Sequence, residues 1–196
     1  MEKLERYIKD LSMKINGIIE DDVVGSSAAM VQTLTKDSND DVFILFNKTA
    51  EQQNKYSTSR RILNLCIILD EDTKGINLLK LLNLIKHNPL KYGEGEKKFN
   101  SIYENSLSLI RAIKSSKTFE EWIYLRDKVI AHRDYNFNSN NIELNVGVAS
   151  KIIEFVLIIF NDILQYCGKD KIEEPNYNEK SSLYKLFVLM TDETKN

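Results

Sequence analysis

The 196-residue chain contains few of the residues that punctuate or cross-link a fold: 7 glycines, 2 prolines and 2 cysteines. Sandwiches, barrels and collagen-like chains need glycine or proline at frequent turns, so this scarcity argues against an all-β fold. The cysteines, Cys66 and Cys167, are too few and too far apart for a zinc site or a disulfide framework. Both lie in apolar runs, where we expect them to be core residues.

The chain also lacks a strong charge of either sign. Its 27 basic and 29 acidic side chains give a net charge of −2, which argues against a globally basic surface for nucleic acid but allows a local basic patch. No apolar signal core follows the charged N-terminus, and the longest apolar stretch, residues 152–164, is too short to span a bilayer. We therefore expect a cytoplasmic protein without membrane contact. Abundant lysine, asparagine and isoleucine are typical of an AT-rich, bacterial genome.

Apolar residues recur at helical spacing through nearly the whole chain, which predicts an all-α fold. We expect a single helical bundle of about seven to nine helices over residues 1–196, without internal repeats or a domain boundary. The Gly-Ser-Ser sequence at residues 25–27 is predicted to break the first helix. Residues 62–69 fit a buried strand over a short window, but the length of the surrounding pattern favours a helix.

Two helix starts carry capping signals. Asn77 is placed to cap the short leucine-rich helix that follows it. Thr118 and Glu121 have the spacing of a capping box, in which the threonine hydroxyl accepts a first-turn N–H and the glutamate reaches back to the cap. We expect this helix to run towards His132 and to be followed by a polar loop at residues 133–145.

Other sequence features favour structural roles. Two acidic clusters, residues 20–22 and 70–72, lack the alternating ligands and glycine of a calcium loop, and we expect them to be solvated turns. Trp122 and its apolar neighbours could form a base-stacking platform, but their helical spacing favours a place in the core. Phosphate-binding glycine loops, cysteine–histidine pairs and Ser-His-Asp arrangements are absent from the sequence. We expect neither a metal nor another cofactor.

The residues best suited to chemistry lie in one charged segment, where Arg126 precedes His132 by six positions. A histidine can remove or donate a proton near neutral pH, and an arginine can stabilise the charge that builds on a phosphoryl group in the transition state. Together they suffice for metal-free cleavage of RNA, with the ribose 2′-hydroxyl as nucleophile. The alternative is a structural ion-pair cluster with Asp127 or Asp134.

The spacing within this segment imposes a geometric condition. On one straight helix, six residues leave the two side chains about 120° apart around the axis and about 9 Å apart along it. Either the helix ends or bends near His132, or two copies of the motif share one cleft across a symmetric dimer. A dimer also doubles the local positive charge, which gives an acidic protein one way to hold RNA.

The segment that begins at Arg126, Arg-Asp-Lys-Val-Ile-Ala-His-Arg-Asp, resembles the signature of the higher eukaryotes and prokaryotes nucleotide-binding (HEPN) superfamily. Within that superfamily, the sequence is most similar to the abortive-infection U-type proteins. The helix and acidic turn at residues 60–72 and the leucine-rich residues 75–85 are similar to the family's segments upstream of the motif. The resemblance implies a HEPN-like helical core at about residues 40–167, with a C-terminal extension at residues 168–196.

The resemblance further implies a dimeric, metal-independent endoribonuclease of the toxin or phage-defence type. Arg126 and His132 match the catalytic positions, and Asp127 matches a polar position that supports the site. Candidate RNA contacts lie within or just after the motif: Lys128, Arg133 and Tyr135. The implied partners are RNA, a second copy of the chain, and an antitoxin or regulatory protein. Some superfamily members bind without cutting, so the alternative function is a non-catalytic helical module that binds a nucleotide or a protein.

Overall fold

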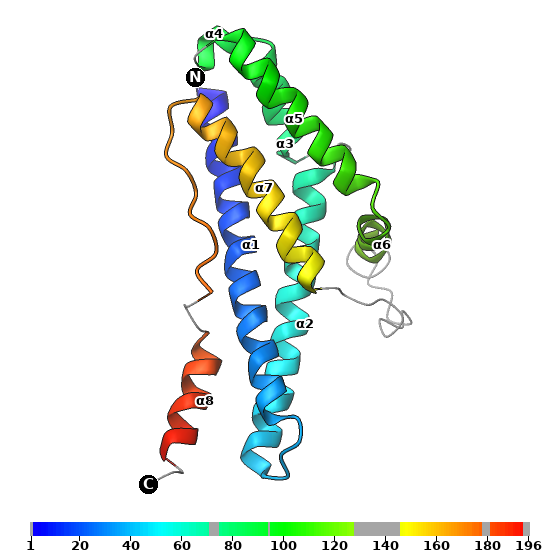
Figure 1. Ribbon diagram of the computed structural model, residues 1–196, viewed down its shortest axis with the longest axis vertical. Coiled ribbons are helices and arrows are strands. Elements are labelled where there is room, and N and C mark those ends of the chain that lie inside the picture. The colour runs from blue at the N-terminus through cyan, green and yellow to red at the C-terminus, as the bar shows by residue number, and fades with distance from the viewer. Residues whose placement is uncertain (1, 71–74, 94, 128–145, 178–180, 194–196) are drawn as a thin grey trace. The chain divides into compact units, whose positions relative to one another are not determined.

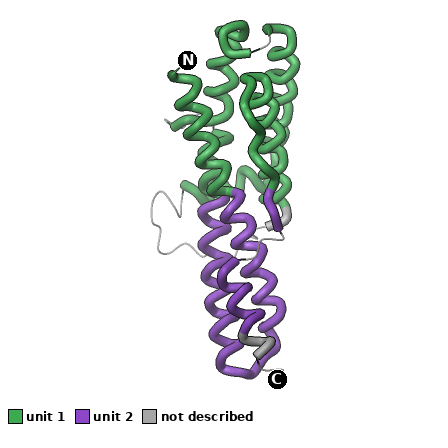
Figure 2. Tube along the Cα trace, turned by 90° about the vertical axis from the view of Figure 1, so that its left-hand side faces the viewer, with its two compact units in different colours: residues 1–18, 62–174 green, residues 19–61, 175–196 purple. Residues whose placement is uncertain are grey.

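The computed structural model describes residues 2–70, 75–93, 95–127, 146–177 and 181–193. Within these ranges the structure is all-helical (Figure 1), which confirms the predicted fold class. The described residues form eight helices: α1 (Glu2–Thr35), α2 (Asp41–Leu69), α3 (Leu78–Lys86), α4 (Pro89–Tyr92), α5 (Glu96–Lys114), α6 (Lys117–Leu125), α7 (Val146–Tyr166) and α8 (Ser182–Glu193). They belong to two compact units (Figure 2): unit 1, residues 1–18 and 62–174, and unit 2, residues 19–61 and 175–196.

Unit 1 is organised around α5, which contacts α3, α4, α6 and α7. Phe99, Ile110 and Ile113 form the buried side of α5. The Phe99 ring lies 4.9 Å, centroid to centroid, from the ring of Tyr166 at the end of α7. The Tyr166 hydroxyl donates to the Pro89 carbonyl oxygen at 2.7 Å, which ties the end of α7 to the start of α4. Aromatic packing and one hydrogen bond therefore hold the end of α7 against α4 and the start of α5.

Unit 2 has its own apolar core, formed by α8 and by parts of α1 and α2. Its buried residues are Ala28, Val31, Phe46, Ala50 and Phe187. The Phe187 ring of α8 meets the Phe46 ring of α2 edge to face, with centroids 5.6 Å apart. This contact explains the apolar spacing of the C-terminal residues, because α8 buries its apolar side in this unit.

The predicted break at residues 25–27 is wrong, because α1 continues without interruption from Glu2 to Thr35. The Ser27 hydroxyl donates to the Val23 carbonyl oxygen within the helix, at 2.9 Å. A Cβ atom on Gly25 would lie only 2.9 Å from the Ser57 hydroxyl oxygen of α2. Gly25 thus permits a close approach of α1 and α2. This role could not be recognised in the sequence, where a glycine indicates a helix break.

The helical prediction for residues 62–69 is confirmed, since they form the last turns of the single 29-residue helix α2. The predicted cap of α3 is also present, because the Asn77 side chain accepts a hydrogen bond from the Lys80 N–H at 2.8 Å. After α7, Gly168 adopts a left-handed φ of 66° and its N–H donates to the Gln165 carbonyl oxygen. These helix ends follow from local side-chain chemistry that can be recognised in a single sequence.

The capping prediction for α6 is wrong by two residues. Ser116, not Thr118, is the N-cap, and its hydroxyl oxygen accepts from the Phe119 N–H at 3.2 Å. Glu121 lies 3.7 Å from the Lys117 ammonium, one turn away on the helix surface. A serine and a threonine two positions apart offer the same cap chemistry, so tertiary packing selects between them.

Candidate functional site

Helix α6 of unit 1 ends at the motif arginine. Phe119, Trp122 and Leu125 are buried at successive helical steps, and Trp122 is only 1% exposed. This confirms the predicted core role of Trp122 and anchors the helix through its apolar face. Arg126 is the C-cap residue of α6 and directly follows Leu125, the last of these buried residues. Packing of α6 thus determines the position of Arg126.

Two carboxylates hold the Arg126 guanidinium group. Its Nε donates to Asp127 Oδ1 at 2.8 Å, and its Nη1 donates to Asp70 Oδ2 at 2.6 Å. The Arg126 side chain keeps 20% of its surface exposed, and the Asp70 side chain keeps 16%. A guanidinium group has five N–H donors, so these two bonds leave part of its donor edge for another acceptor. The arrangement fixes the arginine without enclosing it.

Asp70 is itself held by main-chain hydrogen bonds. It follows the last residue of α2, and its N–H donates to the Cys66 carbonyl oxygen at 2.9 Å. Its carbonyl oxygen accepts from the Asn77 amide nitrogen at 2.8 Å. Asn77 is fully buried and caps α3 with its other amide atom. The end of α2, the cap of α3 and the end of α6 therefore meet at one charged cluster, Asp70, Arg126 and Asp127.

The electrostatics of this cluster favour a charged arginine. Partial burial acts to lower the pKa of Arg126, but the hydrogen bonds that it donates to Asp127 and Asp70 and the negative charges of these carboxylates together outweigh burial and raise the pKa. Burial raises the pKa of the nearby Cys66 thiol to about 12, against the opposing effect of the Arg126 charge. Cys66 is therefore a protonated core thiol and not a nucleophile at neutral pH.

The structure describes only part of the predicted site. It brings Arg126 and Asp127 together by a direct hydrogen bond. The remaining predicted site residues lie outside the described residues: Lys128, His132, Arg133 and Tyr135. Asp70 was expected in a solvated turn, but its side chain is only 16% exposed and pairs with Arg126. Two features of the sequence could have indicated a role for Asp70 in the site: it directly follows a long apolar helix, and it lies in a segment that is similar to the family.

The acidic cluster at residues 20–22 is not a solvated turn. It lies within α1, where Asp22 is fully buried and Asp21 is 6% exposed. Asp22 pairs with the fully buried Arg61, and Asp21 lies 3.3 Å from Arg60. The Tyr177 hydroxyl donates to Asp22 as well, at 2.5 Å. Arg61 therefore lies in the interior of unit 2, and Arg60, whose side chain is 48% exposed, is paired with Asp21, so the two arginines do not form an open basic patch.

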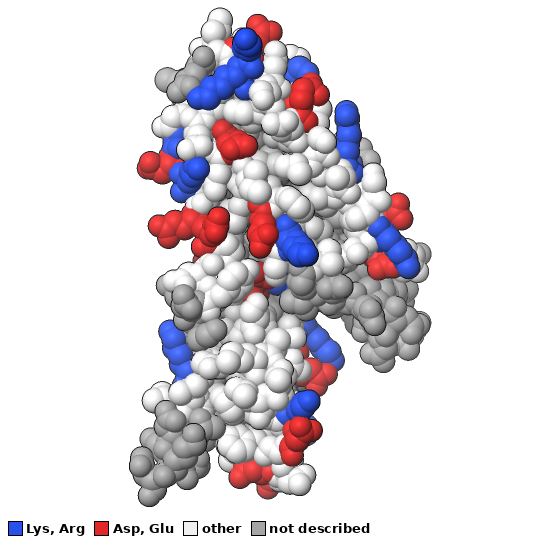
Figure 3. Space-filling view, in the orientation of Figure 1, with Lys and Arg blue, Asp and Glu red and all other residues white. Residues whose placement is uncertain are grey.

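The surface of the described residues shows no extended basic area on the face seen in Figure 3, where basic and acidic side chains are interspersed. Among the described residues, no group of three or more histidine, cysteine, aspartate or glutamate side chains is arranged to hold a metal ion. The helices in the described ranges also include none that is long and apolar enough to cross a bilayer. An anion site on the face seen in Figure 3 must therefore be local.

The sequence matches the HEPN_AbiU2 family, described as AbiU2, over residues 58–165. This match covers more than half of the 196 residues and includes α3 to α6, all but the last residue of α7, and the charged cluster. The comparisons found no similar curated protein and no similar solved structure. The match confirms the resemblance first suggested by the segment at Arg126. The chain thus belongs to the HEPN_AbiU2 family of the HEPN superfamily.

Proposed function

We propose that this protein is a metal-independent endoribonuclease of the abortive-infection or toxin type that acts in the cytoplasm. Membership of the HEPN_AbiU2 family supports this proposal. So does the placement of Arg126 between two carboxylates with part of its side chain exposed. In this proposal, Arg126 stabilises the phosphate in the transition state, His132 transfers protons, and Asp127 orients Arg126.

The proposed reaction uses the substrate's own nucleophile. The ribose 2′-hydroxyl oxygen attacks the adjacent phosphorus and gives up its proton, and the bond from phosphorus to the 5′-oxygen breaks. The 5′-oxygen takes a proton and leaves as a hydroxyl, so the other product ends in a 2′,3′-cyclic phosphate. Negative charge builds on the non-bridging phosphate oxygens, which a fixed guanidinium group stabilises. His132 acts as the general base or the general acid.

The observation that carries the proposal is the partly used donor set of Arg126. Nε and one Nη1 hydrogen are engaged by Asp127 and Asp70, and the remaining N–H groups can bind two phosphate oxygens. Because the side chain is already fixed, little rotamer entropy is lost when the phosphate binds. Pairing of this kind is a means of positioning a catalytic arginine in advance.

The decisive experiment is cleavage of a labelled mixed RNA pool in the presence of EDTA. Wild-type protein is compared with His132→Ala and Arg126→Ala, after circular dichroism and size-exclusion chromatography show that all three fold and elute alike. The proposal expects cleavage by the wild type alone, with cyclic-phosphate ends. Equal cleavage by all three proteins would assign the activity to a contaminant, and absence of cleavage by the wild type would contradict the proposal.

A second candidate function is a non-catalytic module that binds a nucleotide or a protein partner. The charge of the cluster favours the protein-binding form of this module, because one arginine with two carboxylates carries a net charge of −1, which opposes phosphate binding. The first function has two proposed partners, an RNA and a second copy of the chain. The fate of the RNA distinguishes the two functions. A catalytic protein cleaves RNA without metal, whereas the module binds its ligand and leaves RNA intact.

A further inference from the structure

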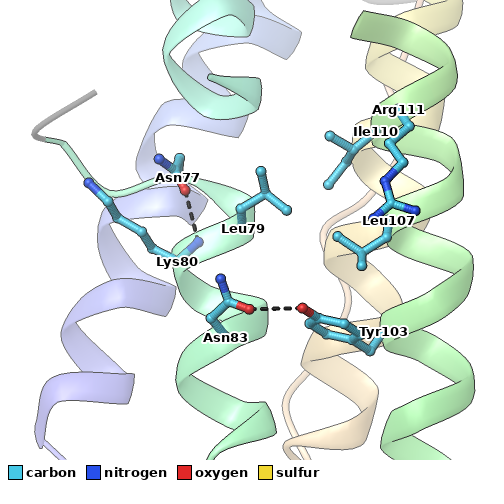
Figure 4. A pocket seen from close by; sticks show the side chains of 8 residues that line it. All are labelled: Asn77, Leu79, Lys80, Asn83, Tyr103, Leu107, Ile110 and Arg111. Carbon is cyan, nitrogen blue, oxygen red and sulfur yellow. Dashed lines mark hydrogen bonds between the residues drawn. The ribbon is translucent and has the colours of Figure 1, made fainter. Parts of the chain in front are cut away.

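A separate pocket lies between α3 and α5 in unit 1 (Figure 4). Its volume is about 300 Å³, at the lower end of the range for small-ligand sites. Four residues of α3 and its cap and four residues of α5 line it: Asn77, Leu79, Lys80, Asn83, Tyr103, Leu107, Ile110 and Arg111. In Figure 4, Leu79 and Asn83 point toward α5, whereas the Lys80 side chain points away from it. The pocket is large enough for one small ligand with a flat ring and too small for a duplex.

The charge of the pocket lining is opposite to that of the chain. Among the described residues, the lining includes two cationic side chains, Lys80 and Arg111, and no aspartate or glutamate, although the whole chain has a net charge of −2. The Lys80 ammonium already donates to the Gly75 carbonyl oxygen at 2.7 Å, so Arg111 is the cation on which ligand binding depends. Arg111 is exposed and makes no ion pair with the described residues. A third cation, Lys86, lies 3.8 Å above the Tyr103 ring beside the pocket. This local excess of positive charge favours an anionic ligand.

The uncharged lining suits a nucleobase. Leu79 and Ile110 are buried and, with Leu107, offer an apolar wall on which a planar ring can lie. The Tyr103 hydroxyl donates to Asn83 Oδ1 at 3.0 Å, which fixes the orientation of that amide. Amide groups can donate to and accept from the edges of unpaired bases, and the exposed Arg111 guanidinium group can bind the attached phosphate. Apolar, amide and cationic groups thus occur together in one pocket.

The pocket is also connected to the charged cluster. Asn77 lines the pocket and donates through its amide nitrogen to the Asp70 carbonyl oxygen at 2.8 Å. Asp70 in turn pairs with Arg126 through its carboxylate. We propose that the α3–α5 pocket binds one nucleotide of the RNA substrate, next to the phosphate held by Arg126. This inference rests on the proposed ribonuclease function and names the site that holds the strand beside the reacting bond.

The first test measures binding separately from cleavage. The probe is a fluorescently labelled single-stranded RNA of mixed sequence whose 2′-hydroxyls are methylated, so that it cannot be cut. Arg111→Gln is expected to raise its Kd about three- to tenfold and to reduce the salt dependence by about one phosphate contact. Lys97→Gln removes the same charge from another exposed position on α5 and is expected to bind like the wild type. Equal Kd values for the two variants, or no binding by the wild type, would overturn the proposal.

A second test locates the ligand. On addition of adenosine 5′-monophosphate, the methyl NMR signals of Leu79, Leu107 and Ile110 should shift, while those of the exposed Ile158 on α7 should not. Inorganic phosphate alone should displace the nucleotide only weakly, because it lacks the ring. Shifts confined to residues outside the pocket would contradict the assignment.

The two proposals can fail separately. If the wild type cuts RNA but Arg111→Gln binds and cuts equally well, the pocket assignment fails and the ribonuclease function stands. If Arg111→Gln weakens binding while no RNA is cut by any protein, the pocket assignment stands and the catalytic proposal fails.

Discussion

At the scale of single residues, the site depends on how Arg126 is held. Asp70→Asn keeps the shape of the side chain but removes its charge, so Arg126 loses one of its two ionic anchors. We expect kcat for RNA cleavage to fall about 10- to 100-fold, because a misplaced group forfeits much of the advantage of fixed geometry. Stability should fall by only about 1–2 kcal/mol. Cleavage assays with Glu104→Gln, an exposed carboxylate of α5, provide the control, and unchanged cleavage by Asp70→Asn would make the ion pair structural.

The buried charges of unit 2 make a second prediction at this scale. Asp22→Ala leaves Arg61 fully buried without its carboxylate partner and removes the acceptor of the Tyr177 hydroxyl. We expect the free energy of unfolding to fall by about 3–5 kcal/mol, as measured by urea denaturation. Asp37→Ala is the matched control, because its carboxylate is 88% exposed and lies 4.0 Å from Lys36. That control should change stability by less than about 1 kcal/mol.

At the scale of helices, the start of α6 distinguishes two possible caps. Ser116→Ala removes the acceptor for the Phe119 N–H and should lower stability by about 1 kcal/mol. Thr118→Ala removes a hydroxyl inside the first turn, where no cap depends on it, and should change stability by less than about 0.5 kcal/mol. Thermal or urea denaturation of both variants measures the difference. A larger loss for Thr118→Ala would restore the capping box that the sequence predicts.

Helices could be predicted from the sequence because their signals are local. The Asn77 cap and the Gly168 stop each depend on a few neighbouring residues. The decisive polar pairs are not local, since Arg61 and Asp22 are 39 positions apart, and Arg126 and Asp70 are 56 positions apart. No periodic pattern shows which distant carboxylate meets which arginine. The motif predicted the pairing of Arg126 with its neighbour Asp127, and only the folded chain reveals Asp70.

At the scale of the whole molecule, two helices connect the two compact units. Residues 18 and 19 are successive positions within α1, and residues 61 and 62 are successive positions within α2. If unit 2 unfolded alone, both helices would have to end in mid-sequence, and backbone groups at the new ends would lose their helical partners. This continuity favours unfolding of residues 1–196 in one cooperative step, as expected of a single domain.

Phe187→Ala tests this cooperativity. It removes an aromatic side chain from the core of unit 2, which should lower the free energy of unfolding by about 3–5 kcal/mol. Trp122, the one tryptophan of the chain, lies in unit 1, so its fluorescence reports that unit while far-ultraviolet circular dichroism reports all helices. We expect both signals to shift to the same lower urea midpoint. Leu189→Ala, at a position of α8 that is 64% exposed, should leave both unchanged. The contrary result is a Trp122 fluorescence transition at the wild-type midpoint together with a dichroism transition that splits in two. It would show that the units unfold independently, because the substitution in unit 2 would then leave the stability of unit 1 unchanged.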